Sequence, residues 1–214
     1  MTNENLAQPL TGIRVLDLSG ELGVYCGKLL ADAGADVMKV EPPGGDSMRR
    51  TGPFIDGVDS PENSLHWRHY NTNKRSITLD IESEDGGALL SRLAENSDVV
   101  LESFQPGYLD SLGLGYGHMS DGNPGLIFAS LTPFGQTGPY KDYKGSDLVG
   151  FAMGGYMYVT GWPDTPPNKL WGLQAFHTTS NRGFTGILIA LYHRLATAQG
   201  QQVDVSMQEA VATT

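Results

Sequence analysis

The chain has 214 residues, a hydrophobic fraction of 39% and a formal net charge of -10, so it is long enough to form one large domain with its own core. This acidic balance disfavours nucleic acid and anionic membranes as partners, although a local Lys/Arg cluster can still hold a small anionic ligand. The single cysteine, Cys26, excludes an intramolecular disulfide, and no apolar run is long enough to span a membrane. Together these features favour the cytoplasm.

The first third of the chain predicts a βαβ unit. Residues 13–18 are typical of a buried strand, residues 24–33 of a helix that stops at Gly34, and residues 36–41 of a second strand. A crossover of this kind makes the two strands parallel. The segment that follows, from residue 42 to about 70, has little periodicity. A loop of that length inside a compact domain is usually functional or disordered.

The alternation of strands and helices continues along the chain. Strands are expected at 76–80, 98–102 and 126–130, and Ser83 is expected to cap a helix that carries Leu89, Leu90 and Leu93 on its apolar face. Then come a Gly/Pro loop (132–143), a helix (147–157), a long buried helix (178–195), a short strand (202–206) and a helix that starts near Met207. This order predicts an α/β fold with a Rossmann-like, doubly wound parallel sheet.

Glycines follow the first predicted strand in the loop that begins at Gly20. Their spacing is G-x-x-G-x-x-x-G rather than the dinucleotide fingerprint, although Glu41 lies about where that fingerprint keeps its ribose carboxylate. A tight turn packed with glycines is therefore favoured over an NAD site. His66 and His69 lack a third ligand at zinc spacing, so no metal site is expected.

Two further segments have residue types suited to a nucleotide ligand. Asn73, Lys74 and Arg75 lie at the end of the long loop, and adjacent cations suit phosphate groups, although solvated charge is an equal alternative. Phe104 lies just beyond the strand at 98–102, where ligands bind in open α/β sheets. It is expected either to stack on an adenine ring or to be a buried aromatic at a turn.

Six separated segments carry a family resemblance. They are residues 11–19, 29–46, 73–77, 109–115, 134–140 and 200–206. In this order they resemble the class III (CaiB/BaiF-type) coenzyme A transferases, and the resemblance extends from about residue 10 to residue 212. It implies a Rossmann-like large domain, a smaller second domain and two polypeptides interlinked like chain rings. Members of the family are about twice this long, so residues 1–214 are expected to be the N-terminal segment of the large domain, without the small domain and the C-terminal part.

The resemblance also implies a reaction, in which CoA moves from an acyl-CoA thioester to a carboxylic acid. An aspartate attacks the thioester to give a mixed anhydride and then an aspartyl-CoA thioester. The CoA thioester is a substrate, and no tightly bound cofactor is expected.

Several positions depart from the family pattern. The nucleophilic aspartate corresponds to Ala175 or Phe176, and the neighbouring His177 would need a different chemistry. The usual Asn before the stacking Phe is Ser103, and the usual Arg of the next segment is Ser111. The residues that remain as expected CoA contacts are Arg49, Asn73, Lys74, Arg75 and Phe104.

The missing acid leads to the main hypothesis, which assigns no catalytic residue to this chain. The chain is expected to be a non-catalytic subunit of a hetero-oligomeric CoA-transferase whose paralogous partner carries the aspartate, in an arrangement similar to benzylsuccinate CoA-transferase. One alternative is an active transferase with its nucleophile outside the matched position. Another is a CoA- or nucleotide-binding scaffold protein, and a dehydrogenase is the remaining one.

Overall fold

The computed structural model describes residues 8–214 and confirms the predicted sheet. Within these residues six strands form one parallel sheet in the order β3-β2-β1-β4-β5-β6. The strands are β1 (Arg14–Asp17), β2 (Asp36–Glu41), β3 (Arg75–Thr78), β4 (Val99–Glu102), β5 (Ile127–Thr132) and β6 (Gln201–Ser206). This order reverses direction between β1 and β4, as in a doubly wound fold, and ligands bind at such a reversal beyond the carboxyl ends of the strands.

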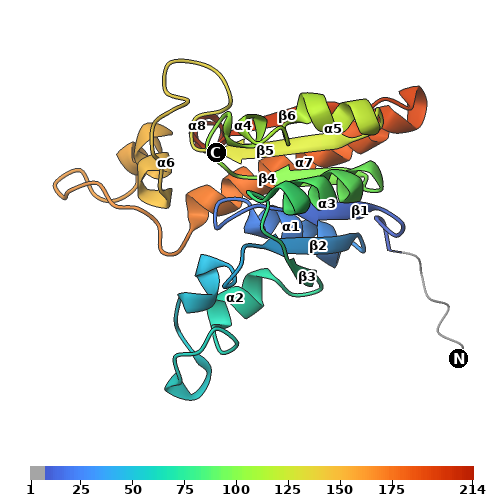
Figure 1. The fold of residues 1–214 in the computed structure, drawn as a ribbon. Coiled ribbons are helices and arrows are strands. Elements are labelled where there is room, and N and C mark those ends of the chain that lie inside the picture. The colour runs from blue at the N-terminus through green and yellow to red at the C-terminus, as the bar shows by residue number, and fades with distance from the viewer. Residues whose placement is uncertain (1–7) are drawn as a thin grey trace, which may run out of the picture.

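Helices cover both faces of the sheet (Figure 1). They are α1 (Val24–Asp32), α2 (Leu65–Tyr70), α3 (Glu84–Glu95), α4 (Tyr108–Ser111), α5 (Tyr116–Gly122), α6 (Asp147–Met153), α7 (Gln174–Thr197) and α8 (Met207–Ala212). Because side chains alternate along a strand, the core has two halves. One half packs the sheet against α1, α7 and α8, and the other packs it against α3, α4 and α5.

Two of the predicted helices differ from the structure in how they are buried. Ser83 caps α3 as expected, since its Oγ accepts a hydrogen bond from the Gly86 N–H at 3.1 Å. Leu90 is fully buried, but Leu89 is 45% exposed, so its assignment to the apolar face was wrong. The helix α7 is longer than expected and is buried on one side only, because Ile189 and Tyr192 face outward.

The long segment after β2 is more regular than the sequence indicated. It contains two short 3-10 helices, η1 (Ser47–Arg50) and η2 (Ile55–Gly57), followed by α2, which Ser64 caps through the Trp67 N–H at 3.0 Å. One or two helical turns are too short to produce a recognisable hydrophobic period. The helices α4 and α5 escaped the sequence analysis for the same reason.

The helix expected at 147–157 ends early. The helix α6 stops at Met153, and Gly155 has a φ of +84°, a conformation that favours glycine. A 3-10 helix, η3 (Tyr156–Val159), follows it. None of the helices within residues 8–214 combines the length and apolarity needed to cross a bilayer.

Candidate functional site

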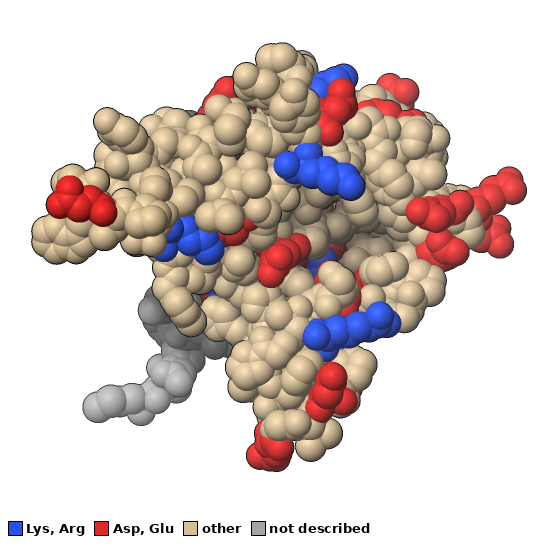
Figure 2. Space-filling view, turned by 90° about the vertical axis from the view of Figure 1, so that its left-hand side faces the viewer, with Lys and Arg blue, Asp and Glu red and all other residues tan. Residues whose placement is uncertain are grey.

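A cavity of about 330 Å³ lies at the carboxyl ends of β1 to β4. Its lining comes from residues 18–20, residues 39–43 with Asp46, residues 79–82, and the aromatic pair Phe104 and Tyr108. We name it the strand-end cavity. These lining segments follow four neighbouring strands, so the parallel sheet alone brings them together. Figure 2 shows the hollowed face at this edge of the sheet, with acidic and basic side chains around it.

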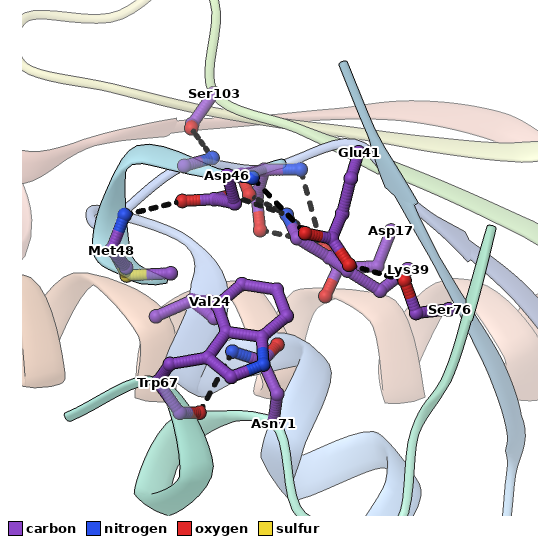
Figure 3. Close-up of polar contacts among 12 residues, drawn as sticks. Asp17, Val24, Lys39, Glu41, Asp46, Met48, Trp67, Asn71, Ser76 and Ser103 are labelled. Carbon is purple, nitrogen blue, oxygen red and sulfur yellow. Dashed lines mark hydrogen bonds and ion pairs between the residues drawn. The ribbon is translucent and has the colours of Figure 1, made fainter. Parts of the chain in front are cut away.

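A network of buried charges lies at the floor of the strand-end cavity (Figure 3). Asp17 Oδ2 accepts a hydrogen bond from Lys74 Nζ at 2.8 Å, and Asp17 Oδ1 lies 3.7 Å from Lys39 Nζ. Lys39 Nζ also lies 3.5 Å from Asp46 Oδ2 and donates to the carbonyl oxygen of Ser19. All these side chains are buried, so their charges are balanced within the protein.

The network shifts the pKa of Asp17 and of Lys74. Burial alone would raise the pKa of Asp17, but Lys39 and Lys74 outweigh burial and hold that pKa below its usual value. Burial lowers the pKa of Lys74, and the nearby Asp17 carboxylate partly offsets this effect. Lys74 Nζ also donates to Val24 O at 2.9 Å and to Asn71 Oδ1 at 3.0 Å. All three donor positions of this ammonium group are therefore occupied by protein atoms.

Arg49 forms a two-pronged ion pair with Glu41 at the end of β2. Its Nε and Nη2 lie 2.6 and 2.8 Å from the two carboxylate oxygens, and its guanidinium stacks 4.2 Å above the ring of Trp67. Burial would raise the pKa of Glu41, but the hydrogen bonds from Arg49 and Ser76 lower it to about 2. Glu41 is therefore ionised, and both of its carboxylate oxygens already accept hydrogen bonds from Arg49. This leaves Glu41 poorly placed to hold a ribose hydroxyl.

The structure separates the five expected CoA contacts. Phe104 lines the strand-end cavity, whereas Arg49 and Lys74 lie around it with their charges paired. Arg75 is exposed and forms a bidentate pair with Asp36, at 2.9 and 2.7 Å. Asn73 Nδ2 donates to Asp32 Oδ1 at 2.8 Å. The sequence showed the three cations and Asn73 but gave no sign of the carboxylates that accept their hydrogen bonds, since these carboxylates lie 8 to 57 residues away.

A second cavity of about 400 Å³ adjoins the first and shares Gly20 and Phe104 with it. Its other lining residues are Glu21, Leu22, Ser103, Gln105, Pro133, Lys144, Gly145 and Phe176. We name it the α7 cavity because Phe176 belongs to the first turn of α7. At Phe176, one of the two positions expected for an acid, the cavity therefore has an apolar ring. The carboxylate in its lining is Glu21, whose Oε1 lies 3.4 Å from His66 Nε2.

The start of α7 is held by a residue that sequence reasoning passed over. Leu173, the N-cap of this helix, makes no side-chain cap hydrogen bond. Asp147 takes over that role, because its Oδ1 accepts from the N–H groups of Ala175 and Phe176 at 2.9 and 3.2 Å. Asp147 Oδ2 lies 2.6 Å from Lys169 Nζ. The partners are 28 and 29 residues apart in sequence, so no local capping pattern pointed to them.

His177 turns away from both cavities towards α2. Its Nε2 lies 2.6 Å from the hydroxyl of Tyr70, and its ring packs 4.7 Å from that of Tyr25. Burial lowers the pKa of His177 and raises the pKa of Tyr70, which favours a neutral hydrogen-bonded pair. Neither cavity has His177 in its lining, which weakens the idea that this residue replaces the missing acid.

Comparison with known proteins places this chain in a family. The family model described as CoA-transferase family III matches residues 10–214. The chain belongs to CoA-transferase family III. Its curated relatives include the succinyl-CoA–D-citramalate CoA-transferase of Chloroflexus aurantiacus, 42% identical over 99% of this chain. Another is the succinyl-CoA:(R)-benzylsuccinate CoA-transferase subunit BbsE of Thauera aromatica, 40% identical over 97% of the chain.

A solved structure of the same family has a closely similar fold. A CAIB/BAIF family protein from Brucella suis matches 97% of this chain with a TM-score of 0.91 and 38% identity, and 55% of that protein is covered. This family III chain spans about half the length of the curated relatives named above, 52% and 50% respectively. The family resemblance and the fold class expected from the sequence are both confirmed.

Proposed function

We propose that this member of CoA-transferase family III is a subunit that lacks a nucleophile at the family position and works with a paralogous subunit that carries the aspartate. The observation behind the proposal is that Phe176, one of the two positions that correspond to the family's acid, presents an apolar ring to the α7 cavity, while the other, Ala175, is buried. The complex would move CoA from an acyl-CoA to a carboxylic acid in the cytoplasm. CoA would act as a substrate rather than as a bound cofactor.

Two further observations support a subunit role. Relatives at similar identity are named as subunits, among them BbsE and the beta subunit of the succinyl-CoA–L-malate CoA-transferase of Chloroflexus aurantiacus, 41% identical over 95% of this chain. The charges around the strand-end cavity are also paired inside the protein, which leaves fewer cations to hold the phosphates of CoA. If the partner subunit has its own CoA-binding site, this chain does not need cations to hold the phosphates of CoA.

CoA contact by Arg49, Asn73, Lys74, Arg75 and Phe104 stays a prediction. Phe104 would make direct contact, because it is part of the cavity wall. The cations Arg49, Lys74 and Arg75 would contact CoA while sharing or leaving the carboxylates that they neutralise. The uncharged Asn73 donates to Asp32.

The test is native purification of the full-length protein, followed by intact mass measurement and a CoA-transfer assay. An Asp-bearing family member that co-purifies, with activity only when both chains are present, is the expected result. Full activity of the pure homo-oligomer would overturn the proposal. Purification without any family member and without activity would favour a CoA- or nucleotide-binding scaffold protein.

A second candidate function, an active transferase with a displaced nucleophile, gains support from Glu21. This carboxylate lines the same cavity as Phe176, although it comes from the loop after β1. It could attack the thioester carbonyl and release CoA as a thiolate, which leaves an acyl-glutamyl anhydride. The thiolate would then attack the glutamyl carbonyl, giving a glutamyl-CoA thioester and the free carboxylic acid.

Hydroxylamine trapping distinguishes the two candidates. Incubation with acyl-CoA and hydroxylamine converts a glutamyl thioester into a hydroxamate, which peptide mass spectrometry locates. A hydroxamate on Glu21, lost in Glu21→Gln, would establish the displaced nucleophile. A hydroxamate found only on the partner chain would establish the subunit role.

A further inference from the structure

A buried carboxyl group lies behind the aromatic wall of the strand-end cavity. The wall consists of Phe104 and Tyr108, whose rings lie 4.9 Å apart. Glu102, at the end of β4, is only 4% exposed, and its Oε2 accepts the Phe104 N–H at 2.7 Å. Glu102 therefore contacts the backbone of a wall residue without lining the strand-end cavity itself.

The surroundings of Glu102 do not neutralise a negative charge. Within residues 8–214, Glu102 forms no ion pair with a Lys, Arg or His side chain. The charged groups that face it are Asp110 on α4 and Asp204 on β6, and both are acids that repel a second carboxylate. Burial and these two acids raise the pKa of Glu102 to about 7, although Ser130 on β5 and the Phe104 N–H favour the ionised form. The group thus gains or loses its proton near neutral pH.

A third cavity gives this carboxyl group access to water. It has a volume of about 150 Å³, and we name it the polar cavity because its lining includes Glu102, Asp110 and the side chains Gln105, Gln136 and Gln202. Tyr116 of α5, an uncharged phenol, also lines it, whereas no titratable group of β1 or α3 does. A polar space of this size holds several water molecules. A proton can therefore reach or leave Glu102 without unfolding of the protein.

The proton changes the charge behind the wall more than it changes the shape of the wall. A carboxyl group can accept a hydrogen bond in its neutral and in its ionised form, so the Phe104 N–H keeps its partner in both states. The ionised form adds one negative charge in a low-dielectric region, where charges interact more strongly than in water. An anionic ligand against Phe104 would meet that charge at close range.

We propose that the proton on Glu102 controls the affinity of this chain for CoA, so that the neutral acid permits CoA to bind against Phe104 and the ionised carboxylate weakens this binding. Affinity should be highest below pH 7 and should fall as the pH rises through 7, since CoA is an anion. Linkage is reciprocal, so bound CoA should favour the neutral acid and binding should take up a proton. The inference rests on the CoA contact proposed for Phe104, and it does not depend on the missing nucleophile.

The experiment measures CoA affinity by calorimetry at pH 6 and pH 8 in low salt. It uses the full-length protein with any partner that accompanies it, because a CoA site on the partner contributes equally to every variant compared. The 3′-phosphate of CoA also titrates in this range, so the wild type is compared with Glu102→Gln, which has a similar shape and stays neutral. We expect Glu102→Gln to bind CoA about fivefold more tightly than the wild type at pH 8 and equally tightly at pH 6.

Proton uptake gives a second readout that a purely structural role of Glu102 would not produce. Calorimetry at pH 7 in buffers with different ionisation enthalpies measures the protons bound together with CoA. The wild type should take up about 0.4 of a proton more than Glu102→Gln.

Three further variants locate the effect. Glu95→Gln makes the same change in net charge at the exposed end of α3 and should behave like the wild type. Asp110→Asn removes one of the two repelling charges, so the loss of affinity should begin at lower pH than in the wild type. Phe104→Leu should weaken CoA binding at both pH values.

Two kinds of result would overturn the inference. If Phe104→Leu weakens binding but the wild type and Glu102→Gln show the same pH dependence, the Phe104 contact stands and the inference alone fails. It fails in the same way if Glu95→Gln has as large an effect as Glu102→Gln. If CoA does not bind, or if Phe104→Leu leaves its affinity unchanged in a protein with normal thermal unfolding, the proposed Phe104 contact and this inference fail together.

Discussion

Glu102, the last residue of β4, is a buried carboxyl group that anchors Phe104 from behind the cavity wall. Its Oε2 accepts the Phe104 N–H at 2.7 Å. Burial raises the pKa of Glu102 from 4.5 to about 7 despite that hydrogen bond. Glu102 therefore changes charge near neutral pH, directly beneath a residue that we assign to ligand binding.

The stability of the protein should reflect this group. The pKa of Glu102 is higher in the folded protein than in the unfolded chain. Its contribution to the free energy of unfolding is therefore full below pH 4.5 and is lost as the pH rises through about 7. From pH 5 to pH 8, the unfolding free energy of the wild type should fall relative to that of Glu102→Gln by about 2.5 kcal/mol. Urea unfolding across this range measures the difference, with Glu95→Gln as the exposed control. If the difference in unfolding free energy between the wild type and Glu102→Gln does not change with pH, burial is not the dominant influence on the pKa of Glu102.

Phe176 is the residue from which we propose that this chain lacks the family nucleophile. We expect Phe176→Asp to place a carboxylate in the α7 cavity, at a helix start that favours negative charge. The variant should gain CoA-transfer activity at least about tenfold above Phe176→Asn, which has a similar shape but no nucleophile. A coupled CoA-transfer assay on both purified variants tests this. Equal inactivity of two folded variants would show that more than the acid has been lost.

At the scale of elements, α7 depends on α6 for its first turn. The carboxylate of Asp147 satisfies two backbone N–H groups of α7 and pairs with Lys169. Lys169 also donates to the carbonyls of Leu170 and Gly172, so the same ion pair secures the segment that leads into the helix. Asp147 and Lys169, which both lie outside α7, thus determine the position of Phe176.

Removing the Asp147 carboxylate should lower the free energy of unfolding more than removing an ordinary helix cap does. Asp147→Ala leaves two buried N–H groups without an acceptor, so we expect a loss of about 2–3 kcal/mol in unfolding free energy. Ser146→Ala removes the cap of α6, a single bond to the Val149 N–H, and should cost only about 1 kcal/mol. Urea unfolding gives both values. Similar losses for the two variants would mean that α7 does not depend on Asp147.

The whole molecule combines a closely packed sheet with an exposed aromatic segment. The three tryptophans fall into two classes, since Trp67 is 7% exposed whereas Trp162 and Trp171 are 79% and 94% exposed. Trp67 lies beneath the Arg49 guanidinium, next to the strand-end cavity. The other two belong to the irregular chain between η3 and α7.

Acrylamide quenching of fluorescence should separate these classes. We expect efficient quenching in the wild type, because two of its three tryptophans face solvent. The double variant Trp162→Phe, Trp171→Phe should retain a blue-shifted, weakly quenched emission from Trp67. If the full-length protein or its complex already protects the two exposed rings, quenching of the wild type will be weak, which would show that another part of the assembly covers them.

The sequence by itself determined the fold class and the family. Strand and helix periods are local properties, so the repeated βα alternation predicted the parallel sheet correctly. The six motifs were equally readable, because each is a short contiguous segment. The absence of an acid at Ala175 and Phe176 followed from the family resemblance and from the distance of these residues to Gly186.

Only the tertiary structure decided what the polar residues do. The CoA contact predicted for Lys74 stays a prediction, but its bond to Asp17, which is 57 residues away, could be found only from the fold. Asp147 was unremarkable in the sequence, yet it caps a helix 28 residues further on. The role of a charged side chain depends on which partners share its low-dielectric surroundings, and long-range packing selects those partners.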